Sequence, residues 1–259
     1  MVQVLKFGGA SVATPESFGR IAEIVLAQEK RAGKVVVVVS AMGDTTDQLF
    51  SLAHQVNPQP PKRELDMLVS VGERVSIALL AMALAAKGRE GVSFTGSQSG
   101  IITDATHSDA RIVDVRPHRL MAALQKEKIV IVAGFQGVSL QGEITTLGRG
   151  GSDTTAVALA VALQSQSVVF YKDVAGIFDA DPKKVSTAKK LPCLSYQEAL
   201  SLCSEESAVL HPRSLSLAEK NGVRLSIRSF MNPWQEGTEI GEGSTPYYSS
   251  YEVKCLPNS

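Results

Sequence analysis

GEITTLGRGGSDTTAVALAVAL, residues 142–163, joins a glycine-rich turn to the start of an apolar helix. We predict that the helix runs from about residue 153 to residue 163 and that Ser152 caps its first turn. Free amides and the positive end of the helix dipole then face the GRGG turn at 148–151, which suits an anionic ligand. Arg149 adds a planar cation that can pair with a carboxylate or a phosphate. The alternative is a flexible loop with a surface arginine before an ordinary helix.

A second glycine turn follows the strand expected at 2–7. Gly8 and Gly9 let backbone amides approach a phosphate closely, and Lys6 at the end of the strand reaches the same place. The helix expected at 15–31 begins with proline in its first turn. The GxxxxGK[ST] spacing of a P-loop is absent, and a glycine pair after a strand also fits a plain tight turn.

Short segments rich in valine and isoleucine alternate with helical periodicity along the chain. Further strands are expected at 34–39, 91–95, 128–133, 167–172 and 223–227. Further helices are expected at 73–87, 116–126, 153–164, 196–202 and 212–221. This alternation predicts βα units in a mostly parallel sheet, with the ligand at the carboxyl ends of the strands. A β-hairpin is expected at 138–146, over the site.

Composition favours a small-molecule ligand. The 259 residues are 44% apolar, enough for a sizeable core, and 26 basic residues balance 26 acidic ones. We therefore expect neither a nucleic-acid partner nor attachment to an anionic membrane. The longest apolar run, 77–86, is too short to span a bilayer, and no signal peptide precedes the first strand. Cys193, Cys203 and Cys255 form no CxxC pair, so we expect free thiols in a reducing, cytoplasmic location.

The order of several longer motifs resembles that of the bacterial aspartate kinases from Val4 to about Ile240. The motifs are KFGGASV (6–12), SAMGDTTDQL (40–49), ELDMLVSVGERVSIALLAMAL (64–84), GFQG (134–137), the 142–163 stretch, KDVAGIF (172–178), DADPKK (179–184) and VLHPR (209–213). The resemblance implies an α/β protein with the amino-acid kinase fold, a three-layer αβα sandwich around a mostly parallel sheet. It also implies a catalytic domain at 1–240, with a substrate lobe to about 165 and a nucleotide lobe after it, and a short tail at 241–259.

The implied activity is phosphorylation of the side-chain carboxylate of L-aspartate by ATP with Mg²⁺. By resemblance, Lys6 stabilises charge on the transferred phosphoryl group, and Asp153 either orients that lysine or helps to place Mg²⁺. Glu73 corresponds to a carboxylate for the substrate ammonium, and Arg149 to a cation for a substrate carboxylate. Further hydroxyl donors to the substrate are Ser40, Thr46 and Ser152. No metal ligand set made of protein residues alone is expected.

The nucleotide site departs from the family pattern. Its implied residues are Lys6, Gly8, Gly9, Lys172, Asp173, Phe178 and Lys183. Four departures fall in or near it: Lys172 for threonine, Phe178 for tyrosine, Lys183 for arginine and Ala208 for lysine. Lys172 offers a phosphate contact by another route, whereas an altered nucleoside preference stays open.

The sequence is also compatible with two other functions. One is a related kinase that acts on another small acid, such as glutamate, acetylglutamate or a nucleoside monophosphate, and the other is a non-catalytic homologue. We expect a homo-oligomer, and a separate regulatory subunit is also open. The 19 residues after Ile240 are too few for the ACT domains that regulate full-length relatives, so we expect no inhibition by lysine or threonine.

Overall fold

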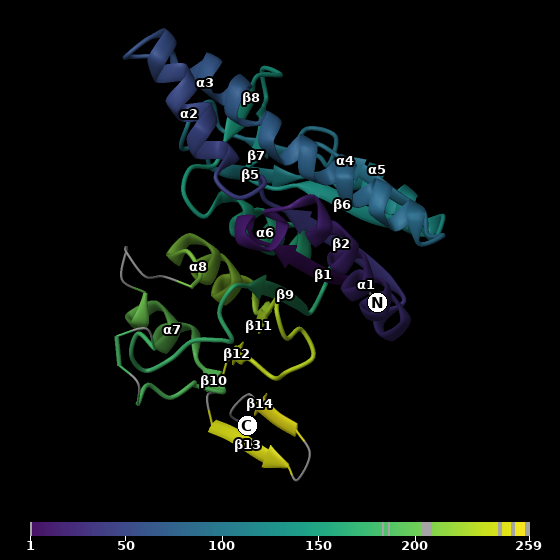
Figure 1. Ribbon diagram of the computed structural model, residues 1–259, viewed down its shortest axis with the longest axis vertical. Coiled ribbons are helices and arrows are strands. Elements are labelled where there is room, and N and C mark those ends of the chain that lie inside the picture. Colours follow the sequence, from purple (N-terminus) through teal and green to yellow (C-terminus); the bar gives the residue numbers. More distant parts are fainter. Residues whose placement is uncertain are drawn as a thin grey trace.

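A mostly parallel sheet of eight strands forms the centre of the molecule (Figure 1). The computed structural model describes residues 2–182, 184–185, 187–203 and 209–242, together with the backbone of two strands at 245–249 and 252–256. The strand order is β10-β12-β11-β9-β1-β2-β6-β3. The strands are β1 (Val2–Phe7), β2 (Lys34–Val39), β3 (Gly91–Phe94), β6 (Ile129–Ala133), β9 (Ser167–Lys172), β10 (Cys193–Leu194), β11 (Arg224–Ser229) and β12 (Thr238–Ile240). Neighbouring strands from β11 to β3 are parallel, and β12 runs antiparallel to β11.

Helices cover both faces of this sheet and complete the expected three-layer sandwich. The helices of the described residues are α1 (Pro15–Ala32), α2 (Thr45–Val56), α3 (Lys62–Val69), α4 (Val71–Ala86), α5 (His118–Gln125), α6 (Gly151–Ala162), α7 (Tyr196–Leu202) and α8 (Pro212–Asn221), with a 3₁₀ turn at Gly9–Val12. Of these, α2 and α3 pack against each other in a small cluster of their own rather than on the sheet. One core packs α1 and α4 against the sheet, and the other packs α5, α6, α7 and α8 against its opposite face. In β1, Leu5 and Phe7 belong to the first core and Val4 to the second. Because side chains alternate along a strand, Lys6 points to the α6 side.

A smaller sheet stands beside the main one, in the order β5-β4-β7-β8. Its strands are β4 (Ile101–Thr103), β5 (Ile112–Val115), β7 (Gln136–Ser139) and β8 (Ile144–Thr146). The antiparallel pair of β7 and β8 confirms the hairpin expected at 138–146. Neither β4 nor β5 was expected, because three or four residues are too few to show a period. The region expected to hold a tail or one edge strand contains an antiparallel pair, β13 (Thr245–Ser249) with β14 (Glu252–Leu256).

The helices α3 and α4 follow one another almost without a break. Together they cover Lys62–Ala86, a stretch of 25 residues in which a window of 18 residues has a mean hydropathy of 1.8; by length and composition alone it could cross a membrane. This stretch is longer than the apolar run seen in the sequence. Ile77, Leu80 and Leu84 on its inner face pack into the core beneath α1, so the core accounts for much of its apolar character.

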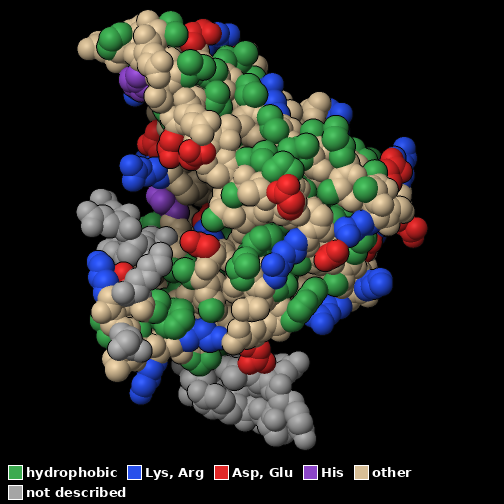
Figure 2. Space-filling model, in the orientation of Figure 1, with side chains coloured by type: hydrophobic (Ala, Val, Ile, Leu, Met, Phe, Trp, Pro, Cys, Tyr) green, Lys and Arg blue, Asp and Glu red, His purple; other side chains and the backbone are tan. Residues whose placement is uncertain are grey.

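The cysteines differ from one another. Cys193 in β10 is disulfide-bonded, so the expectation of free thiols is wrong at this position. The side chain of Cys255 lies outside the described residues. Cys203 is free and half-buried, and burial raises the pKa of its thiol. On the face seen in Figure 2, acidic and basic side chains are interspersed, as the balanced composition predicts.

Candidate active site

The carboxyl ends of β1, β2, β6 and β9 meet at one edge of the sheet, above which a cavity of about 640 Å³ opens. Residues from the turns after β1, β2 and β6, from α2, from the starts of α4 and α6, and from the loops at 108 and 148–150 line it. Of the predicted site residues, it brings together Lys6, Gly9, Ser40, Thr46, Glu73, Arg149, Ser152 and Asp153. The substrate and catalytic residues predicted from the sequence therefore share one cavity, although they are spread over almost 150 positions of the chain.

A buried carboxylate between two lysines forms the floor of the cavity. Asp153 Oδ1 lies 2.5 Å from Lys6 Nζ, and Asp153 Oδ2 lies 2.9 Å from Lys172 Nζ. Lys6 and Asp153 are 4% and 5% exposed. Lys172 enters because β9 lies beside β1 in the sheet, with Lys6 opposite Phe170. The cluster of Lys6, Asp153 and Lys172 carries a formal charge of +1 when all three groups are ionised, so it suits an anion.

The pKa values in this cluster follow from its burial and its charges. Burial lowers the pKa of Lys6 to about 8; the carboxylate of Asp153 opposes this shift, and Lys172 adds to it. For Asp153, burial alone would raise the pKa, but Lys172 and Lys6 outweigh it and lower the pKa to about 2. Asp153 is therefore ionised at neutral pH, and Lys6 loses its proton far more readily than a free lysine.

Glu73 contributes an unsatisfied carboxylate oxygen to the same cavity. It lies in the first turn of α4 and is 2% exposed. Its Oε1 accepts the amide of Ala41 at 3.1 Å, whereas the buried Oε2 has no hydrogen-bond partner. Burial raises the pKa of Glu73 to about 7, although the Ala41 amide and the charge of Lys6 act in the opposite direction. A buried, unpaired carboxylate oxygen is costly, and a ligand ammonium would satisfy it.

The glycine-rich turn before α6 forms one wall. Gly150 has φ +69°, and a Cβ at this position would lie 2.2 Å from the His211 side chain, so only glycine fits. The prediction that Ser152 caps the helix is wrong, because α6 begins at Gly151 with Gly150 as its N-cap. The left-handed turn at Gly150 starts the helix earlier, which places Ser152 inside the first turn. Arg149 is exposed at the rim of the cavity.

Several lining residues were not predicted from the sequence. They are Ala41, Gly43, Asp47, Phe50, Ser108 and Phe135, whereas the glycines of the 148–151 turn line the cavity as expected. Ser108 and Phe135 both have positive φ, +68° and +70°. The GFQG and GDTTD motifs pointed to Phe135 and Asp47, but no local pattern singled out Ser108, which reaches the cavity only through the fold of the loop between β4 and β5.

The predicted nucleotide residues are less tightly grouped. Gly8 directly follows β1, where an added Cβ would lie 3.6 Å from Lys6 Nζ. Asp173 is exposed just after β9, and Phe178 pairs with Lys190 in the connection that follows. Neither side chain lines the cavity. The other two departures from the family pattern, at Lys183 and Ala208, lie outside the described residues.

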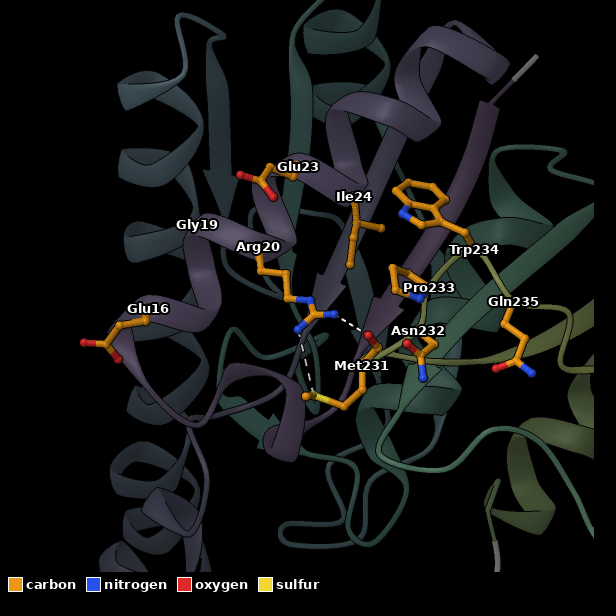
Figure 3. A pocket seen from close by; sticks show the side chains of 10 residues that line it. All are labelled: Glu16, Gly19, Arg20, Glu23, Ile24, Met231, Asn232, Pro233, Trp234 and Gln235. Atoms are coloured by element: carbon orange, nitrogen blue, oxygen red, sulfur yellow. Dashed lines mark hydrogen bonds between the residues drawn. The ribbon is translucent and has the colours of Figure 1, made fainter.

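A larger cavity, of about 850 Å³, lies between α1 and the turn at 231–235 (Figure 3). Arg20 reaches across it to donate to the carbonyl of Met231, and its guanidinium stacks over the ring of Phe230. Glu16 and Glu23 stand at its edge on α1, and both are exposed. Because its central cation already has partners in the protein, we assign the site to the smaller cavity with the lysine cluster.

Known proteins resemble this chain in both sequence and structure. The aspartokinase of Bacillus sp. (strain MGA3) is 50% identical over 242 residues, which cover 93% of this chain and 59% of the relative. The structure of aspartate kinase from Synechocystis matches with a TM-score of 0.83 at 41% identity, covering 98% of this chain and 42% of that chain. E. coli aspartokinase III, solved in complex with aspartate and ADP, matches with a TM-score of 0.82 at 28% identity, covering 95% of this chain and 66% of that chain.

The chain thus spans a little over half the length of the curated relatives it matches. The sequence model of the amino acid kinase family matches residues 1–229, most of the chain. This match agrees with the three-layer fold, which the aspartate kinase structures share. The chain belongs to the amino acid kinase family.

Proposed function

We propose that this chain catalyses the aspartate kinase reaction, in which the γ-phosphoryl group of ATP is transferred to the side-chain carboxylate of L-aspartate. The product is 4-phospho-L-aspartate. The observation that carries the proposal is that the unpartnered Oε2 of Glu73 shares one cavity with the ion pair of Lys6 and Asp153, to which Lys172 adds a second ammonium from outside the cavity lining. The ammonium of an amino acid acceptor would pair with Glu73, and the negative charge of a phosphoryl group would pair with the lysine cluster.

The acceptor is an amino acid with a second acid group. Its ammonium would lie against Glu73, and Arg149 at the rim would take a carboxylate. Ser40, Thr46 and Ser152 line the same cavity, and their hydroxyls would add donors. An N-acetylated acid or a nucleoside monophosphate has no ammonium and would leave the buried oxygen of Glu73 unsatisfied, which disfavours both.

Lys6 would act on the transferred phosphoryl group. Phosphoryl transfer between two oxygens requires alignment and positive charge more than it requires a base. Asp153 holds the ammonium of Lys6 by one oxygen and that of Lys172 by the other, so both cations are fixed before the substrates arrive. Of its two expected roles, the orientation of lysine is the one that this geometry supports.

Magnesium fits this chain best as part of the nucleotide. Both oxygens of Asp153 already face ammonium groups. No cluster of three or more His, Cys, Asp or Glu side chains that could hold a metal occurs among the described residues. Mg²⁺ commonly keeps several waters and binds through substrate phosphates. We therefore propose that Mg²⁺ enters bound to ATP, where it neutralises phosphate charge.

The proposal is tested by following ADP release with Mg-ATP over a panel of acceptors: L-aspartate, L-glutamate, N-acetyl-L-glutamate and UMP. Hydroxylamine trapping identifies an acyl phosphate product. We expect turnover with L-aspartate and at least about tenfold lower kcat/KM with L-glutamate, whose extra methylene displaces the acceptor carboxylate. Equal values for the two acids would contradict the proposal. Binding of aspartate without turnover would identify a non-catalytic homologue.

A further inference from the structure

A fully buried carboxylate outside the cavity connects several segments of the cavity wall by hydrogen bonds. Asp66 lies in α3 and is 0% exposed. Its Oδ1 accepts the hydroxyl of Thr146 at 2.6 Å, and both its oxygens accept the amide of Ser108 at 3.1 Å. The Nδ1 atom of His107 lies 2.7 Å from its Oδ2. One carboxylate thus joins three segments that are distant in the sequence: α3, the loop between β4 and β5, and β8.

Two of these segments border the acceptor part of the cavity. Ser108 lines the cavity and has φ +68°, a conformation that a serine adopts only when its surroundings hold it there. Thr146 ends β8 and leads, through Leu147, into the turn that carries Arg149. The amide of Ala110 donates to the carbonyl of Thr146 at 2.9 Å, so a backbone hydrogen bond also joins the loop between β4 and β5 to the end of β8.

The third segment carries the opposite side of the cavity. Asp66 precedes Glu73 by seven residues on the nearly continuous helical stretch of α3 and α4. Seven residues are close to two helical turns, so both side chains lie on the same side of that stretch, about 10 Å apart along its axis. Asp66 therefore holds Ser108 and the Arg149 turn, which form one wall of the cavity, at a fixed position relative to the Glu73 carboxylate on the opposite side.

We propose that Asp66 is a positioning residue that sets the spacing between Glu73 and the Arg149 turn and thereby selects the length of the acceptor acid. This inference rests on the proposed function, since it assumes that the ammonium of the acceptor lies at Glu73 and its side-chain carboxylate on the side of the Arg149 turn. Glutamate, which has one more methylene between its ammonium and its side-chain carboxylate than aspartate, needs a wider spacing. A loosened wall would accept both lengths, at the cost of affinity for the shorter one.

The test compares Asp66→Asn with the wild type and with Asp114→Asn. Asp114 is an exposed carboxylate on β5 of the same small sheet and serves as a matched control. We expect Asp66→Asn to raise the KM for L-aspartate by about tenfold or more, with the KM for ATP within about twofold of the wild type. The ratio of kcat/KM for L-aspartate over L-glutamate should fall by at least about fivefold. The control should match the wild type in all three.

Equal rises in the KM for L-aspartate and for ATP, or an unchanged acceptor ratio, would overturn the inference, because a general loss of structure affects both substrates. If Asp66→Asn does not fold, Thr146→Val removes one partner of the carboxylate and should move the same quantities in the same direction. A wild-type chain inactive on every acceptor would refute the proposed function but not the anchoring. Hydrogen exchange tests that part independently: the Ser108 amide should exchange faster in Asp66→Asn, and unchanged protection would overturn it.

Discussion

The buried centre of the site, where the acceptor would meet the phosphoryl group, and the connection after β9 on the nucleotide side are held in different ways. Lys6, Glu73 and Asp153 are each at most 5% exposed, and each is placed by a strand or a helix of the main sandwich. By contrast, Asp173 is exposed and Phe178 is half-buried in the long connection between β9 and β10. Removing one charge of the buried cluster leaves another buried charge with fewer partners, which is costly. In the exposed connection, water can solvate a group that has lost its partner. Substitutions should therefore have graded effects across the site.

The largest effect is expected at Lys6. Lys6→Met should lower kcat by about 10²- to 10³-fold, the usual result of removing one charge-stabilising donor, and leave the affinity for aspartate largely intact. Steady-state kinetics with calorimetric binding of aspartate would measure both. Lys34→Met is the control, because Lys34 is exposed at the opposite end of the neighbouring strand, beside Val2. Near wild-type turnover of Lys6→Met would remove Lys6 from the phosphoryl end of the site.

Arg149 should have the next largest effect, on binding rather than on turnover. Arg149→Ala should weaken aspartate by about 2 kcal/mol, at the lower end for a charge pair because the side chain is exposed without ligand. Calorimetric titration of aspartate measures this change, and the affinity for ATP should not move. Arg116→Ala removes another exposed arginine, 57% exposed in its side chain, and serves as the control. A change within about 0.5 kcal/mol would place Arg149 outside the acceptor site.

The pH profile should report the two shifted groups. Glu73 must be ionised to bind an ammonium, and burial raises its pKa to about 7, so activity should fall as the pH drops below that value. Lys6 must keep its proton, and burial lowers its pKa to about 8, so activity should also fall above that value. The profile of kcat/KM for aspartate should be bell-shaped, losing about tenfold per unit outside this window. Glu73→Gln should remove the acidic limb, and a profile unchanged by it would contradict the assignment.

The smallest effect is expected in the connection after β9. Phe178→Tyr restores the residue that the family pattern has at this position. Since Phe178 does not line the cavity and packs in a half-exposed connection, the KM for ATP should change by less than about threefold. Inhibition by ADP gives a second measure of the same subsite. A change of tenfold or more would show that the nucleotide is held as tightly by this connection as the acceptor is by the core.

Local sequence patterns predicted most of the main sheet and its helices, and the reason is visible in particular elements. The valine run of β2 and the helical period of α1 and α8 are local signals, and the structure has these elements within one or two residues of the predicted bounds. The short strands β4 and β5 carry no such signal. The helices α2 and α3 were not predicted, although both are amphipathic like α1.

The residues that face the ligand were also largely readable from the sequence. Lys6, Glu73, Arg149 and Asp153 stand in motifs whose residue types and order are themselves informative, and they share one cavity. The protonation states of these residues could not be predicted from the sequence. The pKa values of Lys6 and Glu73 depend on burial, which is set by what packs over them.

The sequence by itself determined the βα order, the two glycine turns and the identity of the charged groups, because each of these depends on a few adjacent residues. Only the tertiary structure decided that Lys172 shares the carboxylate of Asp153 and that Asp66 joins Ser108 to Thr146. These contacts link positions 19 to 80 residues apart. They arise from the order of the strands in the sheet and from a loop whose backbone adopts a positive φ. Neither feature produces a periodic pattern in the sequence.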